Sequence, residues 1–208
     1  MRTLMLCLAL SPLPALAHPH MFVDSRLDLV LDDARNVTGL SLSWTYDDFT
    51  TLLILEDMGL DPDGDAQLSD AELAQLKGFD LVEWPEGFEG DLYFYHDGEQ
   101  VPLDHPVPAT VAVTDGRIVA THTRSLTPTP ADGLQILQYD PTYYVAYTLS
   151  GGVHLPAPCT ATVTEPNPDA ATQALARELD QVPADQFSPL RLGIHYAQDV
   201  RITCNAPS

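Results

Sequence analysis

Acidic side chains crowd one short stretch, "GLDPDGDAQLSDAEL" (residues 59–73), in which aspartates occur at every second position. A hard cation such as Ca2+ needs several oxygen ligands that converge on one point. The EF-hand loop supplies them from its positions one, three, five, seven, nine and twelve. Counted from the first alternating aspartate, the spacing predicts a Ca2+ site with the ligands Asp61, Asp63, Asp65, the Gln67 carbonyl, Ser69 and Glu72.

One position of this loop departs from the EF-hand pattern. The sixth position usually holds glycine for a sharp turn, and here it is Ala66. A left-handed alanine costs roughly 1 kcal/mol, so we expect weaker binding rather than none. The alternative interpretation is a solvated acidic turn in which Ser69 and Glu72 only cap the following helix. That alternative leaves the alternating aspartates unexplained.

Histidines open a second stretch, "HPHMFVD" (residues 18–24), directly after an apolar segment. Residues 1–17, "MRTLMLCLALSPLPALA", have the charged start, apolar run and small-residue end of a secretory signal peptide. Cleavage after residue 17 places an α-amine and an imidazole together on His18, with His20 two residues further on. Nitrogen ligands of this kind favour copper, nickel, cobalt or zinc.

A carboxylate is expected to complete this transition-metal site, and Asp24, Asp47 and Asp140 are the candidates. The sequence does not choose among them. The alternative interpretation is a mobile terminus that carries two exposed histidines. Among the scattered histidines further along, His122 in "ATHTRS" is more typical of a strand residue with satisfied hydrogen bonds than of a ligand.

The charge balance excludes one class of partner. The 208-residue chain has 9 Lys and Arg against 30 Asp and Glu, a net charge of −21 at pH 7. Nucleic-acid binding needs a basic surface for the phosphates, so we expect none here. An acidic protein instead attracts cations by long-range steering. No segment after residue 17 is long and apolar enough to span a membrane, so we expect an exported protein.

Two cysteines remain once the predicted signal peptide is removed, Cys159 and Cys204. An even pair in an oxidising compartment predicts a disulfide. A loop of this size makes it worth about 3–4 kcal/mol. The alternative is a pair of soft metal ligands, but neither cysteine has a His or Cys neighbour in the sequence.

Periodicity of the apolar residues predicts the elements that position these groups. Residues 18–46 alternate with a period of two on either side of the turn "DDARN", which predicts a hairpin of two strands. The pattern then becomes helical, with Phe49, Leu52 and Leu53 on one stripe. A second helix is expected to begin at Ser69 and to end near residue 78.

From about residue 91 onward the chain is mostly β. Two Asp-Gly pairs, at 97–98 and 115–116, lie between strand-like runs and favour tight hairpins. One Ala- and Leu-rich interruption, residues 168–182, is helix-like. These patterns predict one α+β domain over residues 18–208, mainly antiparallel and sandwich-like. It carries a helix–acidic loop–helix (EF-hand-like) insertion at about 47–78.

Five short phrases occur in one order along the chain: "HPHMFVD", "LSWTYDD", "LDPDGDAQLSDAEL", "QYDPTYYVAYTL" and "APCTATV". This set resembles the DUF1007 family. The resemblance implies a periplasmic protein of a Gram-negative bacterium, a component of an ABC-type transport system encoded beside nickel/cobalt-type transporters. The family's opening His-Pro-His falls on residues 18–20, its acidic loop on residues 61–72, and its Tyr-Asp-Pro motif on residues 139–141.

These features favour one function over two others. The leading expectation is a periplasmic accessory protein, not an enzyme, that captures or delivers a transition metal for a membrane metal transporter, with Ca2+ as a structural brace. The second is a calcium-braced structural or protein-binding module without a transition metal. The third is a copper-dependent, monooxygenase-like enzyme that uses His18 and a further histidine, His122 or His154. There is no Gly-x-Ser-x-Gly motif for hydrolase chemistry.

Overall fold

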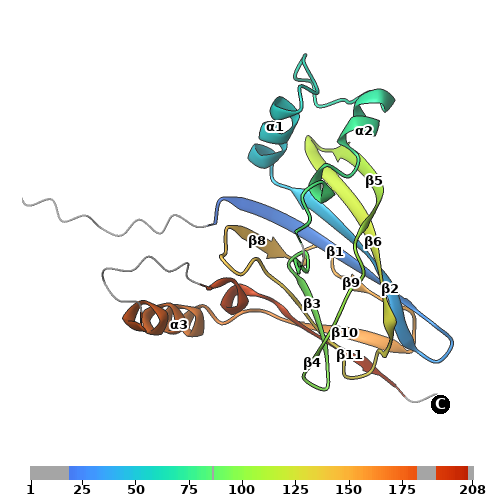
Figure 1. Ribbon diagram of the computed structural model, residues 1–208, viewed down its shortest axis with the longest axis vertical. Helices are drawn as coiled ribbons and strands as arrows, with labels where there is room; N and C mark the ends of the chain where they lie inside the picture. Colours follow the sequence, from blue (N-terminus) through green and yellow to red (C-terminus); the bar gives the residue numbers. More distant parts are fainter. Residues whose placement is uncertain (1–18, 86, 182–190, 206–208) are drawn as a thin grey trace, which may run out of the picture.

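The computed structural model describes residues 19–85, 87–181 and 191–205. The predicted signal peptide, residues 1–17, and His18 lie outside these ranges. Figure 1 shows two layers of strands, with helices α1 and α2 together at one end of the molecule. The elements follow the chain as β1 (Met21–Leu31), β2 (Asn36–Tyr46), α1 (Asp48–Asp57), α2 (Asp70–Leu76), η1 (Phe79–Leu81), β3 (Leu92–His96), β4 (Glu99–Val101), β5 (Val107–Thr114), β6 (Arg117–Pro130), β7 (Gln135–Gln138), β8 (Val145–Thr148), β9 (Val153–His154), β10 (Cys159–Thr164), α3 (Pro168–Gln181), η2 (Gly193–Tyr196) and β11 (Asp199–Cys204).

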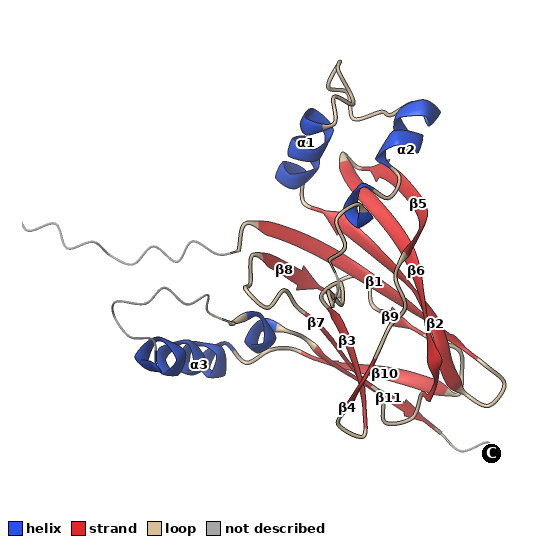
Figure 2. Cartoon of the chain, viewed as in Figure 1, coloured by secondary structure: helices blue, strands red, loops and turns tan. Residues whose placement is uncertain are grey.

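The strands form two sheets, which Figure 2 shows in red. Sheet A has the order β5-β6-β2-β1-β8, with β9 also paired to β1. Sheet B has the order β10-β11-β7-β3-β4. Most neighbouring strands are antiparallel, so the expected fold class, α+β with mainly antiparallel strands, is confirmed.

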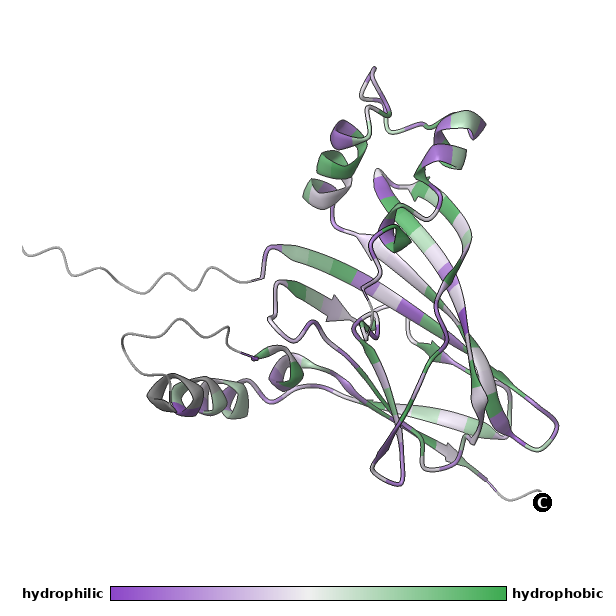
Figure 3. Cartoon of the chain, viewed as in Figure 1, coloured by the Kyte–Doolittle hydropathy of each residue, from purple (hydrophilic) through white to green (hydrophobic). Residues whose placement is uncertain are grey.

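The hairpin expected in residues 18–46 is strands β1 and β2, which pair antiparallel from Val23↔Tyr46 to Leu31↔Val37. The period-two pattern sets the faces, because successive side chains of a strand point to opposite sides. Val23, Ser25, Leu27 and Leu29 are buried, whereas the residues that alternate with them, Asp24, Arg26 and Asp28, are half-buried or exposed. Figure 3 shows this alternation of hydrophobic and hydrophilic residues along β1.

Both Asp-Gly pairs form the expected tight turns. Asp97 and Gly98 join β3 to β4, and Asp115 and Gly116 join β5 to β6. All four residues have positive φ, between 51° and 81°. Two positive φ values in succession characterise the turn that matches the twist of paired strands, so the local sequence determines both hairpins.

One edge of β1 pairs parallel with strands from much later in the chain. Met21 to Asp24 pair with β8, and Leu27 and Asp28 pair with β9. Between them the Gly151 amide donates to the Ser25 carbonyl. These parallel pairs were not expected from the sequence, because no local pattern indicates which distant segment completes a sheet edge.

The hydrophobic core lies between the two sheets. Sheet A contributes Leu27, Leu42 and Ile118, and sheet B contributes Phe94 and Ile136, each at most 1% exposed. Each such side chain is worth roughly 1.5–3 kcal/mol when fully buried. Residues of both sheets belong to one core cluster, so the described residues of the two sheets form one unit.

A buried arginine is fixed at the edge of this core. The Arg124 side chain is 2% exposed. It donates to three backbone carbonyls, those of Asp104 at 2.7 Å, Glu89 at 2.6 Å and Leu103 at 3.2 Å. Its guanidinium also lies over the Trp84 ring, 5.5 Å from the centroid. The guanidinium therefore ties the segments around residues 89 and 104 to β6.

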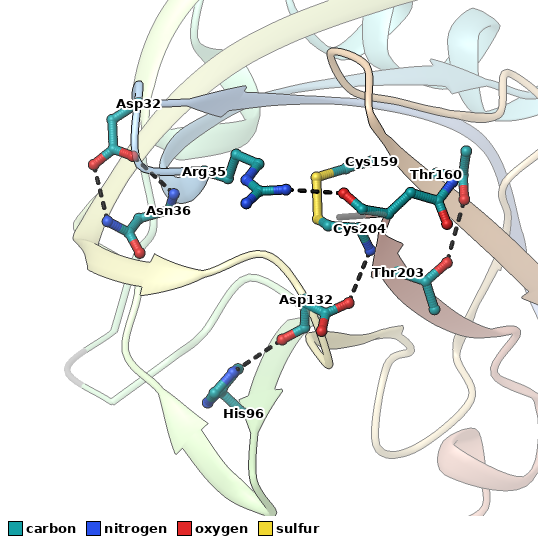
Figure 4. Close-up of a disulfide and its surroundings, with 10 residues drawn as sticks. Asp32, Arg35, Asn36, His96, Asp132, Cys159, Thr160, Thr203 and Cys204 are labelled. Atoms are coloured by element: carbon teal, nitrogen blue, oxygen red, sulfur yellow. Dashed lines mark hydrogen bonds between the residues drawn. A yellow bond between two sulfur atoms is a disulfide. The ribbon is translucent and has the colours of Figure 1, made fainter. Parts of the chain in front are cut away.

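The expected disulfide joins Cys159 to Cys204, with an S–S distance of 2.03 Å. The two cysteines are direct partners in the β10–β11 pair. Figure 4 shows that the Cys204 amide donates to Asp132 Oδ1 and that Arg35 donates to the carbonyl of Asn205. This disulfide fits an extracellular or periplasmic location, because such bonds persist in oxidising compartments. Among the described residues, no helix has the length and hydropathy of a membrane span.

Candidate cation-binding site

Two short helices hold the acidic loop between them. The first, α1, begins after Asp47, whose carboxylate accepts from the Thr50 amide at 2.8 Å and caps the helix. The second, α2, begins after Ser69, which forms the predicted capping box with Glu72. Leu68, the loop's one apolar residue near α2, packs against the core. These local contacts fix both ends of residues 58–69.

The three alternating aspartates converge. Carboxylate oxygens of Asp61, Asp63 and Asp65 all lie within 4.8 Å of one another. Asp61 is half-buried, and the other two are exposed. Among the described residues, no other group of three His, Cys, Asp or Glu side chains comes this close. Oxygen ligands in this arrangement suit a hard cation such as Ca2+.

Hydrogen bonds inside the loop hold the carboxylates in place. Asp61 accepts from the amides of Asp65 and Ala66, each at 3.1 Å. Asp65 accepts from the Gln67 amide at 2.8 Å and from its side-chain nitrogen at 3.0 Å. Ala66 has a φ of 58°, the left-handed conformation expected for position six. Position six is therefore left-handed although the residue there is alanine.

Glu72 faces the start of the same loop. One oxygen accepts from the Asp61 amide at 3.4 Å, and the other accepts from the Ser69 amide at 2.8 Å and hydroxyl at 2.7 Å. These bonds, the one from the Ser69 hydroxyl foremost, lower the pKa of Glu72 from its ordinary value. A carboxylate kept ionised at this position can cap α2 and also serve a bound cation.

The segment formed by α1, the acidic loop and α2 carries a concentrated negative charge. Residues 47–76 include nine carboxylates and no lysine or arginine, and the next residue is Lys77. Like charges held close together repel, and the repulsion is strongest at low ionic strength. A bound divalent cation would offset it at its centre, Asp61, Asp63 and Asp65.

The residues predicted for the transition-metal site lie on segments that meet at the start of β1. His18 is outside the described residues. The His20 amide donates to the Tyr144 carbonyl at 2.9 Å, and the two rings lie 4.9 Å apart. The Phe22 amide donates to Asp47 Oδ2 at 2.8 Å. His20, Asp47 and the turn before β8 are therefore close in the fold.

The candidate carboxylates for that site have structural partners. Asp47 accepts hydrogen bonds at both oxygens as the cap of α1. Asp140 accepts from the amides of Thr142 and Val145 and shapes the turn before β8. Asp24 pairs with Arg117 at 2.9 Å. Among the described side chains, none of these carboxylates belongs to a three-ligand group with His20.

The two histidines considered for oxidative chemistry have different surroundings. His122 is 2% exposed, and its ring meets Trp44 edge-on at 4.8 Å. Burial, with a smaller contribution from the Arg124 charge, lowers the pKa of His122 to about 4. His154 is exposed, and its Nε2 lies 2.9 Å from the Gly151 carbonyl. His122 is thus a neutral interior residue on sheet A.

Sequence reasoning missed a buried acid, Asp91. It is 7% exposed, and its Oδ2 accepts a 2.9 Å hydrogen bond from the Tyr147 hydroxyl. Its backbone carbonyl accepts from the Tyr139 amide. Asp91 thus contacts Tyr139 and Tyr147, on either side of Asp140 and Tyr144 in the sequence. The sequence "EGDLYFY" reads as a turn before a strand and gives no signal of this burial.

Together, these features define a class: a two-sheet, mainly antiparallel β protein whose helical insertion gathers three carboxylates. A family model described as "Protein of unknown function (DUF1007)" matches residues 3–204, so the chain belongs to this family. The chain is also similar to a protein of Haemophilus influenzae, described as "Uncharacterized protein". The two are 27% identical over 203 residues, which cover 91% of this chain and 92% of that protein.

Proposed function

We propose that this protein is a periplasmic metal-binding accessory protein that serves a membrane metal transporter. The acidic loop binds Ca2+ in the manner of an EF-hand, and the segment His18–His20 binds a transition-metal ion. The observation that carries the proposal is the convergence of Asp61, Asp63 and Asp65 to within 4.8 Å. Neither the binding of Ca2+ nor the binding of a transition-metal ion requires catalytic turnover, so the protein acts by stoichiometric binding.

The calcium part of the proposal follows from the chemistry of the loop. Asp61, Asp63 and Asp65 supply carboxylate oxygens, and Gln67 supplies its backbone carbonyl. Glu72 closes the loop from the first turn of α2, as position twelve does in an EF-hand. The ion would connect the end of α1 to the start of α2. The left-handed conformation at Ala66 lowers the affinity, which suits an extracytoplasmic site that works at millimolar Ca2+.

The transition-metal part rests on the position of His20. It is exposed at the first residues of β1, and its backbone is fixed by the Tyr144 carbonyl. Mature protein that begins at His18 adds an α-amine and a second imidazole two residues away. Such nitrogen donors favour nickel, cobalt, copper or zinc over calcium. The two sites therefore take different ions.

The location outside the cytoplasm is supported by two independent features, and the net charge supports the choice of ligand. The Cys159–Cys204 disulfide needs an oxidising compartment. Residues 1–17 have the pattern of a signal peptide. The net charge of −21 attracts metal cations and disfavours nucleic acids. The transporter partner and the periplasm follow from the family resemblance.

The test is native mass spectrometry of metal-stripped protein that begins at His18, titrated with Ca2+, Zn2+, Ni2+, Co2+ and Cu2+. We expect Asp63→Asn to lose Ca2+ and His20→Ala to lose the transition metal. Asp70→Asn is the matched control, because Asp70 is exposed on the same insertion but outside the ligand frame. Adding one residue before His18 blocks the α-amine and weakens only transition-metal binding.

Other outcomes decide between the alternatives. Binding of Ca2+ alone would replace the proposal with the calcium-braced module. Loss of copper in His154→Ala, together with oxidase or oxygenase turnover, would favour the enzyme. Equal Ca2+ binding by wild type and Asp63→Asn would mean that the acidic loop is not the Ca2+ site.

A further inference from the structure

Helix α1 exposes large apolar side chains to solvent. Phe49 is 64% exposed, Leu52 61% and Leu53 48%. Two threonines instead face inward, Thr50 at 5% and Thr51 at 2% exposed. Leu55 also faces inward, at 4% exposed. The helix therefore buries one leucine beside two threonines and leaves three large apolar side chains in solvent, whereas the apolar stripe of a surface helix usually packs on the core.

Specific hydrogen bonds fix this orientation. The Ile118 amide on β6 donates to the Thr51 hydroxyl at 3.1 Å, and the Thr50 hydroxyl donates to Asp47 at 2.8 Å. Buried hydroxyls that are satisfied in this way would lose their partners if the helix rotated. The exposure of this apolar face is therefore fixed by the fold.

A groove continues the apolar face toward the acidic loop. It has a volume of about 330 Å³. The walls of the groove are mostly apolar, and one end of the groove lies at the acidic loop. The lining residues are Leu52, Leu55, Glu56, Gly59, Leu60, Asp61, Pro62 and Gly64. A second hollow of about 490 Å³ lies near the C-terminal end of α1 and is mixed in character. Its lining comprises the apolar residues Ile54, Met58, Phe79 and Val82 and the polar residues Asp57, Gln75, Lys77, Asp80 and Glu83. Apolar surface that is grouped and rimmed by polar residues marks an interaction site.

The charge around the groove indicates the chemistry of a partner that can bind there. Asp48, Glu56 and Asp57 are exposed on α1 itself. They belong to the stretch 47–76, which has nine carboxylates and no basic residue. This charge repels anionic lipid surfaces. It complements an apolar segment that is flanked by lysine or arginine.

We propose that the exposed face of α1, defined by Phe49, Leu52 and Leu53 and the adjoining groove, binds a basic amphipathic segment of a partner protein. The segment presents apolar side chains at helical spacing to this face and places lysines or arginines opposite the carboxylates. The binding of this segment goes beyond metal binding. The helix face itself is formed by residues outside the ligand frame, and the groove meets that frame only at its end, at Asp61.

The experiment uses a fluorescent peptide of leucine and lysine in an amphipathic helical pattern, about four helical turns long. Its binding to the purified protein is followed by fluorescence anisotropy, in EDTA and in Ca2+. The double variant Phe49→Ser/Leu52→Ser should bind about tenfold more weakly or worse. The matched control, Val30→Ser/Val107→Ser, removes apolar side chains that are 54% and 61% exposed elsewhere. It should bind like wild type.

Further measurements distinguish binding at this surface from non-specific electrostatic or hydrophobic attraction. A peptide of the same composition in scrambled order should bind more weakly, and a leucine–glutamate peptide should not bind. Glu56→Gln/Asp57→Asn should weaken binding and flatten its salt dependence. Equal binding by wild type and Phe49→Ser/Leu52→Ser, with matched thermal unfolding, would overturn the proposal. So would binding to phosphatidylcholine vesicles with no binding to the peptide.

Discussion

The Tyr147 hydroxyl donates a 2.9 Å hydrogen bond to Asp91 Oδ2 inside the protein, linking β8 of sheet A to the residue before β3 of sheet B. Asp91 is 7% exposed. Burial raises the pKa of Asp91 from its ordinary value of 3.8 to about 7; the Tyr147 hydrogen bond opposes this change, and the Asp140 charge adds to it. This carboxyl group therefore changes charge near neutral pH.

The raised pKa predicts a stability that falls with rising pH. Between about pH 4 and pH 7 the folded state keeps the Asp91 proton while the unfolded state has lost it. The contribution of Asp91 to the free energy of unfolding therefore falls as the pH rises through that window, and it stays low at higher pH. Urea unfolding of wild type and Asp91→Asn at a series of pH values should show that the variant lacks this decline.

Asparagine suits the position, because Asp91 has a φ of 56° and asparagine tolerates the left-handed region. Tyr147→Phe is the complementary variant. It removes the bond that favours the charged carboxylate, so the pKa of Asp91 in the folded state should rise further and the upper end of the decline should extend to higher pH. The same pH dependence in wild type and Asp91→Asn would contradict this account.

Replacing Ala66 with glycine should raise the affinity of the acidic loop for Ca2+. Ala66 has a φ of 58°, and relief of about 1 kcal/mol of strain corresponds to roughly fivefold in the dissociation constant. Isothermal titration calorimetry of wild type and Ala66→Gly checks this prediction.

Gly64→Ala is the matched opposite change. Gly64 has a φ of 69°, and a Cβ there would meet nothing within 4 Å. The cost is therefore conformational, and Ca2+ binding should weaken by a similar factor. If Ala66→Gly left the affinity unchanged while Gly64→Ala lowered it, position six would not limit binding.

Loss of the Arg124 side chain should destabilise the fold strongly. Arg124→Leu leaves the carbonyls of Glu89, Leu103 and Asp104, which are in partly buried hydrogen bonds, without their donor, and we expect this to cost about 3–5 kcal/mol. Arg26→Met is the control, because Arg26 is exposed and its ion pair with Asp28 lies at the surface. It should leave the free energy of unfolding nearly unchanged. Denaturant titration of both variants gives the comparison, and similar losses would contradict the proposed role.

The disulfide should stabilise the fold, because the loop that it closes restricts the unfolded chain. Cys159 and Cys204 are 45 residues apart in the sequence. Cys159→Ser/Cys204→Ser should lower the free energy of unfolding by about 3–4 kcal/mol. The same loss is expected when wild type is unfolded under reducing conditions, and reduction should not change the variant.

Features set by neighbouring residues could be predicted from the sequence. The β1–β2 hairpin, the two Asp-Gly turns and the Ser69–Glu72 capping box follow from patterns a few residues long. The left-handed Ala66 follows from the spacing of the loop. In each case the interacting groups are close in the sequence, so local rules suffice.

Features set by distant partners could not be predicted. The stripe of Phe49, Leu52 and Leu53 that the periodicity of α1 indicates is exposed in the structure. The choice of the buried face is made by Thr51 and the Ile118 amide, which are 67 residues apart. Asp91 is buried by Tyr147, 56 residues later. The sequence predicts a transition-metal site that includes His20, Asp47 and Asp140. The fold brings the segments of these residues together. Both carboxylates, however, accept hydrogen bonds from backbone amides, Asp47 in the cap of α1 and Asp140 in the turn before β8.

The parallel pairing of β1 has a consequence for the order in which the chain folds. The first strand needs β8 and β9, whose residues come more than a hundred positions later. A chain that emerges from its N-terminus cannot complete sheet A until residues 145–154 have appeared. Such non-local pairing slows folding. We expect a nascent chain to stay extended over most of its length, and thus competent for threading through a narrow translocation channel.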